Sequence, residues 1–186
     1  MPFGSLWLPV LVSGAAVWIA SAVAWMVLPH HRSDFKGLAD ETPVADALRK
    51  QALPPGEYRV PYCADMKQMK DPAFLKKFED GPVALIVLAK SERPAMGKSL
   101  VLYLAYTIFV SFVVGYVLRL TLQTSSPGGE IFRLAGTVAI AAYAIAWIPE
   151  SIWMGRPWPH TIKNVVDAVV YGLITGAIFC SLWPRG

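Results

Sequence analysis

Charged residues are scarce in this chain and are missing from long stretches of it. Only 16% of its 186 residues are Asp, Glu, Lys or Arg, against about 25% in a typical soluble domain. Twelve of the 17 basic and ten of the 13 acidic residues lie between positions 29 and 98. This distribution excludes a disordered, collagen-like or coiled-coil chain, and it argues against a single water-soluble globule.

Other features that would mark a soluble enzyme or a nucleic-acid-binding protein are also missing. Cys63 and Cys180 are the only cysteines, so no disulfide framework is visible. Basic residues are mixed with nearly as many acidic ones, which argues against nucleic acid as a partner. Gly97-Lys98-Ser99 resembles the end of a phosphate-binding loop, but Glu92 stands where the first glycine is needed. Without a catalytic constellation, we expect neither an enzyme nor a bound cofactor.

Long apolar runs are what the sequence does contain. A bilayer core of about 30 Å requires roughly 20 apolar residues in a helix. We predict membrane-spanning helices over residues 5–28, 99–119, 131–149 and 164–184, with an interfacial loop over 150–163. The first run could be a cleaved signal peptide, but no basic residue precedes it and it is long for one, so a membrane anchor is the better interpretation. The predicted fold class is an all-α membrane protein with four transmembrane helices.

The polar segment 29–98, between the first and second spans, has the pattern of a small α/β insertion. Thr42 is expected to be the N-cap of one helix, and Asp71 precedes Pro72 at the start of another. Alternating apolar residues around Tyr58 and the apolar run 83–88 predict two strands. A unit this small buries little surface, so we expect it to lean on the membrane or on a partner.

Basic residues are concentrated on one face of this predicted layout. The insertion and the loop 150–163 together carry far more Lys and Arg than the opposite face, which has Arg119, Arg133 and Arg185. The positive-inside rule then places the insertion in the cytoplasm and both termini outside.

Small residues recur at about four-residue spacing in every span. Such residues let helix backbones approach closely. They are Ala16, Ala20 and Ala24, then Ser111 and Gly115, then Ala135 and Ala139, and finally Gly172 and Gly176. They favour either packing within one bundle or a face for another subunit or a second copy of the chain.

The predicted loop 150–163 is rich in aromatic and basic residues. Trp153, Arg156, Trp158 and Lys163 suit an interfacial anchor, or a contact with a lipid headgroup or a partner. Asp167 is expected to be an acid in the first turn of the last span, although a role in ion passage stays open. No predicted span has a charged residue near its centre, which argues against an ion-coupled transporter.

Two groups of side chains are weak candidates for a metal site. Cys63, Met66 and Met69 offer soft sulfur ligands of the kind that suit Cu(I). His30 and His31 lie on the same predicted face, as does His160. The spacing matches no standard metal motif, and the two adjacent histidines also suit the membrane exit of the first helix.

Four stretches resemble a family of bacterial four-span inner-membrane proteins to which no activity is assigned. They are Leu28-Pro-His-His-Arg-Ser-Asp34, Leu53-Pro-Pro-Gly-Glu-Tyr-Arg-Val-Pro61, Met96-Gly-Lys-Ser-Leu100 and Ser151-Ile-Trp-Met-Gly-Arg-Pro-Trp158. The resemblance implies a bacterial inner-membrane protein with four spans, and it implies no functional residue. Three hypotheses remain: a non-catalytic accessory or assembly subunit, a protein that binds a small molecule, lipid or metal, and a small transporter.

Overall fold

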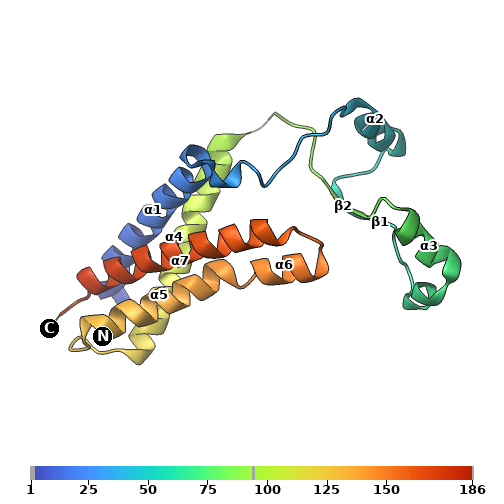
Figure 1. Cartoon of the computed structure of the whole chain (residues 1–186). Coiled ribbons are helices and arrows are strands. Elements are labelled where there is room, and N and C mark those ends of the chain that lie inside the picture. The colour runs from blue at the N-terminus through green and yellow to red at the C-terminus, as the bar shows by residue number, and fades with distance from the viewer. Residues whose placement is uncertain (1–2, 94, 186) are drawn as a thin grey trace. The chain divides into compact units, whose positions relative to one another are not determined.

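The computed structural model describes residues 3–93 and 95–185, which form two compact units (Figure 1). The first unit contains the chain up to Lys36 and from Ala95 onward, and the second is Gly37–Pro94.

The first unit is built from long apolar helices. Helix α1 (Trp7–Ala22) is preceded by the 3-10 turn η1 (Phe3–Leu6) and continued by the π-helical turn η2 (Val23–Val27). The other helices are α4 (Met96–Thr121), α5 (Gly128–Ala144), α6 (Trp147–Trp153) and α7 (Trp158–Ser181). Among the described residues, four helical segments have the length and hydropathy to cross a membrane: Gly4–Val27, Met96–Thr121, Gly128–Trp153 and Trp158–Ser181.

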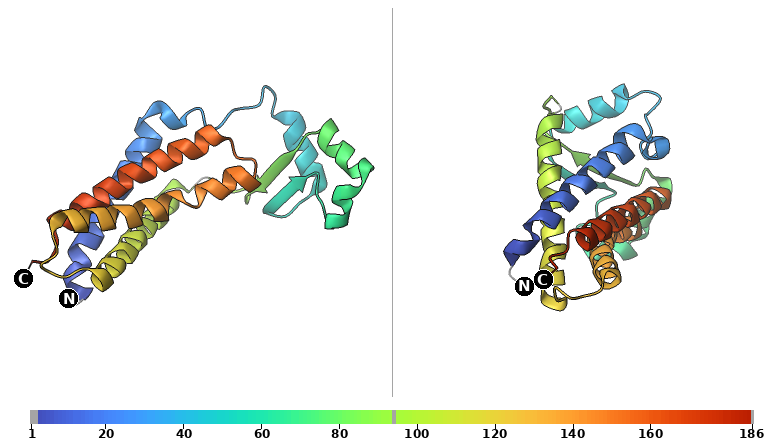
Figure 2. Two further views of the ribbon diagram at one scale, coloured as in Figure 1. Left: turned by 60° about the horizontal axis from the view of Figure 1, so that its bottom comes forward. Right: turned by 90° about the vertical axis from the view of Figure 1, so that its left-hand side faces the viewer.

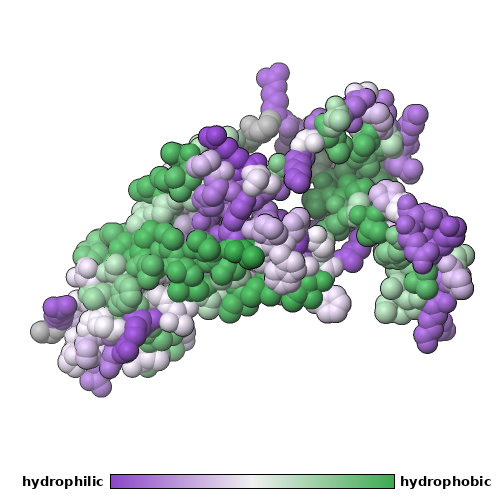
Figure 3. Space-filling model, viewed as in Figure 1, coloured by the Kyte–Doolittle hydropathy of each residue, from purple (hydrophilic) through white to green (hydrophobic). Residues whose placement is uncertain are grey.

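The surface of these helices agrees with a lipid environment. On α7, Ile162, Val166, Val170 and Leu173 are 58%, 55%, 45% and 49% exposed and lie three or four residues apart, so they form one apolar stripe. Figure 3 shows hydrophobic residues covering much of the visible face of the bundle helices. The chain is therefore an all-α integral membrane protein with four spans and a small insertion that contains a two-stranded sheet.

Glycines set the packing inside the bundle. Helices α5 and α7 run side by side (Figure 2), because Gly172 lies against Gly136 and Ile140, and Gly176 lies against the backbone of Phe132. On the other side, Gly14 of α1 contacts the backbone of Ile108 in α4. A side chain at these glycines would push the helices apart.

The third span is interrupted and the fourth begins earlier than the sequence suggested. Pro149 has no N–H to donate to the carbonyl of Ile145, and the helix breaks at Ile145–Ala146 before continuing as α6. Helix α7 starts at Trp158, where Pro159 occupies its first turn. The connection between the two helices is therefore 154–157, and not the whole of 150–163.

The second unit has the predicted order of helix, strand, helix, strand. It contains α2 (Thr42–Gln51), β1 (Gly56–Val60), the 3-10 turn η4 (Met66–Lys70), α3 (Pro72–Asp80) and β2 (Ala84–Leu88). The strands are antiparallel, with Gly56 opposite Leu88 and Val60 opposite Ala84.

An aspartate carboxylate accepts a backbone N–H at the start of each helix of this unit. The side chain of Asp71 accepts a hydrogen bond from the Ala73 N–H, as expected for an N-cap. The prediction for Thr42 was wrong: it is the first residue of α2, and the Asp40 carboxylate accepts from its N–H at 2.9 Å. Phe74 is the one buried side chain among the described residues of the unit, so its core is minimal.

Candidate metal centre and the adjoining pocket

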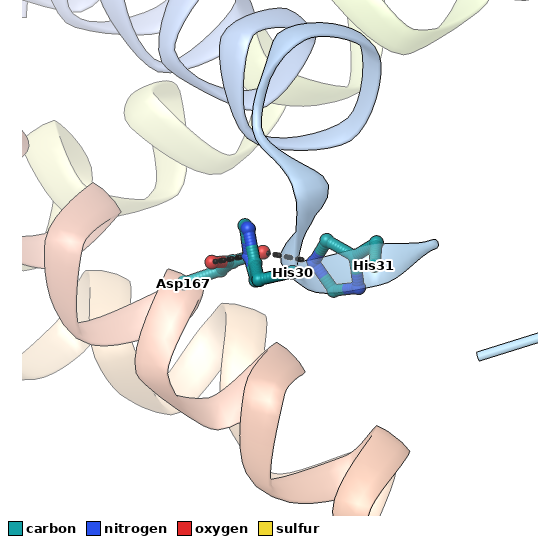
Figure 4. A group of neighbouring side chains, drawn as sticks. All are labelled: His30, His31 and Asp167. Carbon is teal, nitrogen blue, oxygen red and sulfur yellow. Dashed lines mark hydrogen bonds and ion pairs between the residues drawn. The ribbon is translucent and has the colours of Figure 1, made fainter. Parts of the chain in front are cut away.

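A short turn after the first span places the two adjacent histidines beside the last helix. Leu28 is extended because it precedes Pro29, and this ends the first helical span. The 3-10 turn η3 (Pro29–His31) follows, and the ring of Trp25 stacks on His31 at 3.9 Å between centroids. Figure 4 shows the carboxylate of Asp167, from α7, directed at both imidazoles.

His30, His31 and Asp167 form a convergent group. His30 Nε2 lies 3.1 Å from Asp167 Oδ1, and His31 Nε2 lies 2.7 Å from Asp167 Oδ2. One ligand atom of each residue lies within 4.8 Å of the others. The side chains of His31 and Asp167 are 3% and 10% exposed, so this group is largely removed from solvent.

Asp34 supports the group from the opposite side of His31. Its carboxylate contacts His31 Nδ1 at 2.5 Å and accepts a hydrogen bond from Lys163 Nζ at 2.6 Å, with His160 Nδ1 at 3.6 Å. Burial raises the pKa of Asp34, but hydrogen bonds from Lys163 and His31 and the charges of His160 and Lys163 outweigh it and lower the pKa. Asp34 is therefore a carboxylate at neutral pH.

His31 lies between two carboxyl groups, and each of its two contacts needs a proton or a cation. An ionised carboxylate only accepts hydrogen bonds, so each contact between a carboxyl group and a ring nitrogen of His31 needs either a proton, carried by one of the two partners, or a cation that they share. When the Nδ1–H donates to Asp34, the lone pair of Nε2 is directed at Asp167. A second proton satisfies this contact at 2.7 Å, and a metal ion would satisfy it at a longer separation.

A pocket of about 440 Å³ begins at Asp167 and lies within the first unit. Its lining includes Trp18, Trp25 and Trp147 together with Tyr103, Tyr106, Tyr143 and Tyr171. The tyrosine rings form a ladder, with centroids 5.7, 5.9 and 5.5 Å apart from Tyr103 through to Tyr171. The volume falls in the range of about 300–1,000 Å³ that is typical of small-molecule sites.

The sulfur candidates from the sequence belong to the second unit. The Cys63 thiol donates to the Asp65 carbonyl at 3.0 Å. Met66 and Met69 are 79% and 41% exposed. His30 and His31 belong to the first unit, where they meet Asp167 instead of sulfur ligands.

The residues predicted for the interface lie at the connection of α6 and α7 or beside the histidine cluster. Trp153 and Trp158 are 76% and 53% exposed. Arg156 contacts Glu150 at 3.5 Å and lies 5.3 Å from the centre of the Trp147 ring. Lys163 turns inward to Asp34 and Ser33.

The small residues predicted to pack helices are mostly buried within the bundle. Ser111 donates to Ser13 between α4 and α1, at 3.3 Å. Ala16 and Ala20 are partly exposed, and the remainder, Ala24, Gly115, Ala135, Ala139, Gly172 and Gly176, are buried.

Asp167 is the member of the group with His30 and His31 that sequence reasoning placed wrongly. It lies nine residues after Trp158, so it is in the middle of α7 and not in its first turn. A sequence signal was available in the Pro157-Trp158-Pro159 motif, which favours a helix start.

Comparison of the chain with protein-family models, with curated proteins and with solved structures finds no match.

Proposed function

We propose that this integral membrane protein binds a divalent transition-metal ion through His30, His31 and Asp167. The observation that carries the proposal is the convergence of two imidazole nitrogens and one carboxylate, with a second carboxylate, Asp34, at the far nitrogen of His31. Metal-bound histidines usually donate their other N–H to a carboxylate in this way, which fixes the ring and its tautomer.

The ligand set suits a small group of metals. Two imidazoles and one carboxylate are typical of Zn²⁺ and of non-haem Fe²⁺. Three protein ligands leave at least one coordination position for water or a bound molecule, and Asp167 also lines the aromatic pocket. Metal ions in such open sites polarise or activate what they bind.

A bound ion requires only a modest rearrangement. Ligand atoms about 2.1 Å from a tetrahedral ion are roughly 3.4 Å apart, whereas these atoms lie within 4.8 Å. The most distant pair would close by up to about 1.4 Å, for which the 33% exposed His30 side chain has room, and the 2.7 Å contact between His31 and Asp167 would open by about 0.7 Å.

Metal content measures this proposal directly. The full chain is purified in mild detergent, stripped with a chelator and titrated with Zn²⁺ and with Co²⁺, whose visible spectrum reports its geometry. We expect one ion per chain, and a loss of at least tenfold in affinity for His31→Ala and for Asp167→Asn.

A matched control separates this site from the sulfur candidates. A Cys63→Ser, Met66→Leu, Met69→Leu variant should retain full binding, because these side chains belong to the other unit. Unchanged affinity in both site variants, or loss in the control alone, would overturn the proposal. No binding by the folded wild type would also overturn it, and the cluster would then be a hydrogen-bonded contact between His31 and two aspartates.

We also infer a bacterial inner-membrane location, with the insertion in the cytoplasm and both termini outside. The excess of Lys and Arg in and around the insertion supports this orientation. The resemblance noted for the sequence supports the bacterial origin.

An accessory or assembly role, with self-association or binding to a larger membrane complex, stays a prediction. Gly172 and Gly176 are engaged by α5 of the same chain, so a partner would have to use other faces. Native purification in mild detergent, followed by identification of co-purifying proteins, measures this role. A lone monomer would count against it.

A further inference from the structure

Two of the tyrosines that line the aromatic pocket have buried hydroxyls that need a partner. Tyr143 and Tyr171 are 7% and 5% exposed and both line the pocket. Among the described residues, neither hydroxyl has a hydrogen-bond partner. Buried polar groups are nearly always paired, so these two hydroxyls indicate a bound molecule that offers hydrogen-bond acceptors.

The walls of the pocket indicate the shape of that molecule. Tyr143 meets Tyr171 edge to face at 5.5 Å and Tyr106 at 5.9 Å. Trp18 of α1 and Trp25 of η2 also line the pocket. Aromatic walls of this kind favour a planar ring, which can stack or make edge contacts. Met26, Met96 and Leu100 add an apolar region suited to an alkyl tail.

The charges around the pocket indicate a neutral molecule. None of the described residues that line it is Lys or Arg, and Asp167 contributes negative charge at its edge. Two cations lie near the lining residues and both are engaged: Lys163 by Asp34 at 2.6 Å, and Arg156 by Glu150 at 3.5 Å and by the Trp147 ring. A fatty-acid carboxylate or a phospholipid phosphate would therefore enter without a partner and next to a carboxylate.

We infer that the pocket binds a neutral, lipid-soluble molecule whose planar ring carries carbonyl oxygens, which is the chemistry of an alkylated quinone. The hydroxyls of Tyr143 and Tyr171 donate to the ring oxygens, and the tail lies along the apolar region. The inference goes beyond metal binding, because it depends on residues that are not metal ligands.

Quenching of tryptophan fluorescence by decyl-substituted benzoquinone tests the inference on the full chain in detergent micelles. Trp18, Trp25 and Trp147 line the pocket, so a bound ring should quench them saturably. Replacing both hydroxyls, in Tyr143→Phe with Tyr171→Phe, preserves the rings and should weaken binding about tenfold. The control Tyr116→Phe removes a hydroxyl from a residue that is 48% exposed and outside the pocket, and it should bind like the wild type.

Competition identifies the class of molecule. Decylbenzene has the same tail and a ring without acceptors, so it should displace the quinone at least tenfold less well. Decanoate, which has an anionic head, should not displace it. If the double variant does not fold, each single variant and the wild-type competition series still decide the outcome.

Several results would overturn the inference. They are quenching that rises linearly without saturation, equal affinity in wild type and the folded double variant, and stronger displacement by decanoate than by decylbenzene. Metal content is measured on the same samples. If no metal binds but quinone binding is saturable and depends on the two tyrosines, the metal proposal fails and this inference stands. If metal binds but quinone does not, the metal proposal stands and this inference fails.

Discussion

At the scale of single residues, the buried side chains around His31 are stable together only because their charges are paired. Asp34 and Asp167 lie on either side of the same imidazole, and Lys163 neutralises Asp34. A buried carboxylate is tolerated only when it is paired. The cluster therefore holds the segment after the first span against α7 whether a proton or a metal ion completes it.

Removing the charge of Asp34 should weaken metal binding without removing a ligand. In Asp34→Asn the side chain keeps its shape, but the support for His31 Nδ1 becomes neutral, and we expect metal affinity to fall about 10- to 100-fold. A chelator-competition titration measures this. Asp46→Asn, at an exposed pair with Arg49 on α2, is the control and should have no effect. Equal affinity in both variants would limit Asp34 to anchoring the segment.

At the scale of elements, the exact start of α7 decides what Asp167 can do. Starting at Trp158 places Asp167 mid-helix, where it faces His30 and His31. Ser151 and Thr161 form a hydrogen bond of 2.6 Å that ties α6 to the first turn of α7. Close packing of α5 on α7 through glycine then keeps the pocket wall in place.

Adding a methyl group at Gly172 should loosen this packing. A Cβ there would lie 2.3 Å from Ile140 Cγ1 and 2.8 Å from the Gly136 carbonyl oxygen. We expect Gly172→Ala to destabilise the folded chain by about 1–3 kcal/mol, seen as a lower thermal midpoint in detergent. Gly129→Ala, in the first turn of α5 with nothing within 4 Å, is the control and should be neutral or stabilising. If the thermal midpoint of Gly172→Ala equals that of the control, the tight contact between α5 and α7 at Gly172 is refuted.

At the scale of the whole molecule, the site belongs entirely to the four-span unit. Its residues come from the segment after the first span and from α7, which are more than 120 positions apart in the chain. Their contact requires that the end of the first span and the start of the last lie at the same end of the bundle. The insertion and the α6–α7 connection should therefore share one side of the membrane.

Cysteine labelling checks this arrangement. Three variants each contain a single cysteine. One keeps Cys63 and lacks Cys180; the other two lack both native cysteines and carry Trp153→Cys or Ser125→Cys. An impermeant maleimide on intact cells should label only position 125, and the other two should react after the membrane is opened. Labelling of positions 63 and 153 from opposite sides would disprove the shared side. Labelling of both positions from outside would instead show that the orientation is the opposite of the one inferred.

The sequence by itself determined the four apolar spans and the small α/β insertion, because hydropathy over about 20 residues and the local signals of Pro and Asp need no distant contacts. Only the tertiary structure decided the site. His30 and His31 were visible as a pair, but their third partner, Asp167, is fixed by helix packing and by a start of α7 six residues earlier than hydropathy suggested. The pocket hydroxyls of Tyr143 and Tyr171 could not be recognised in the sequence either. A tyrosine in a span looks the same whether it faces lipid or a neighbouring helix, and only the packed bundle determines which.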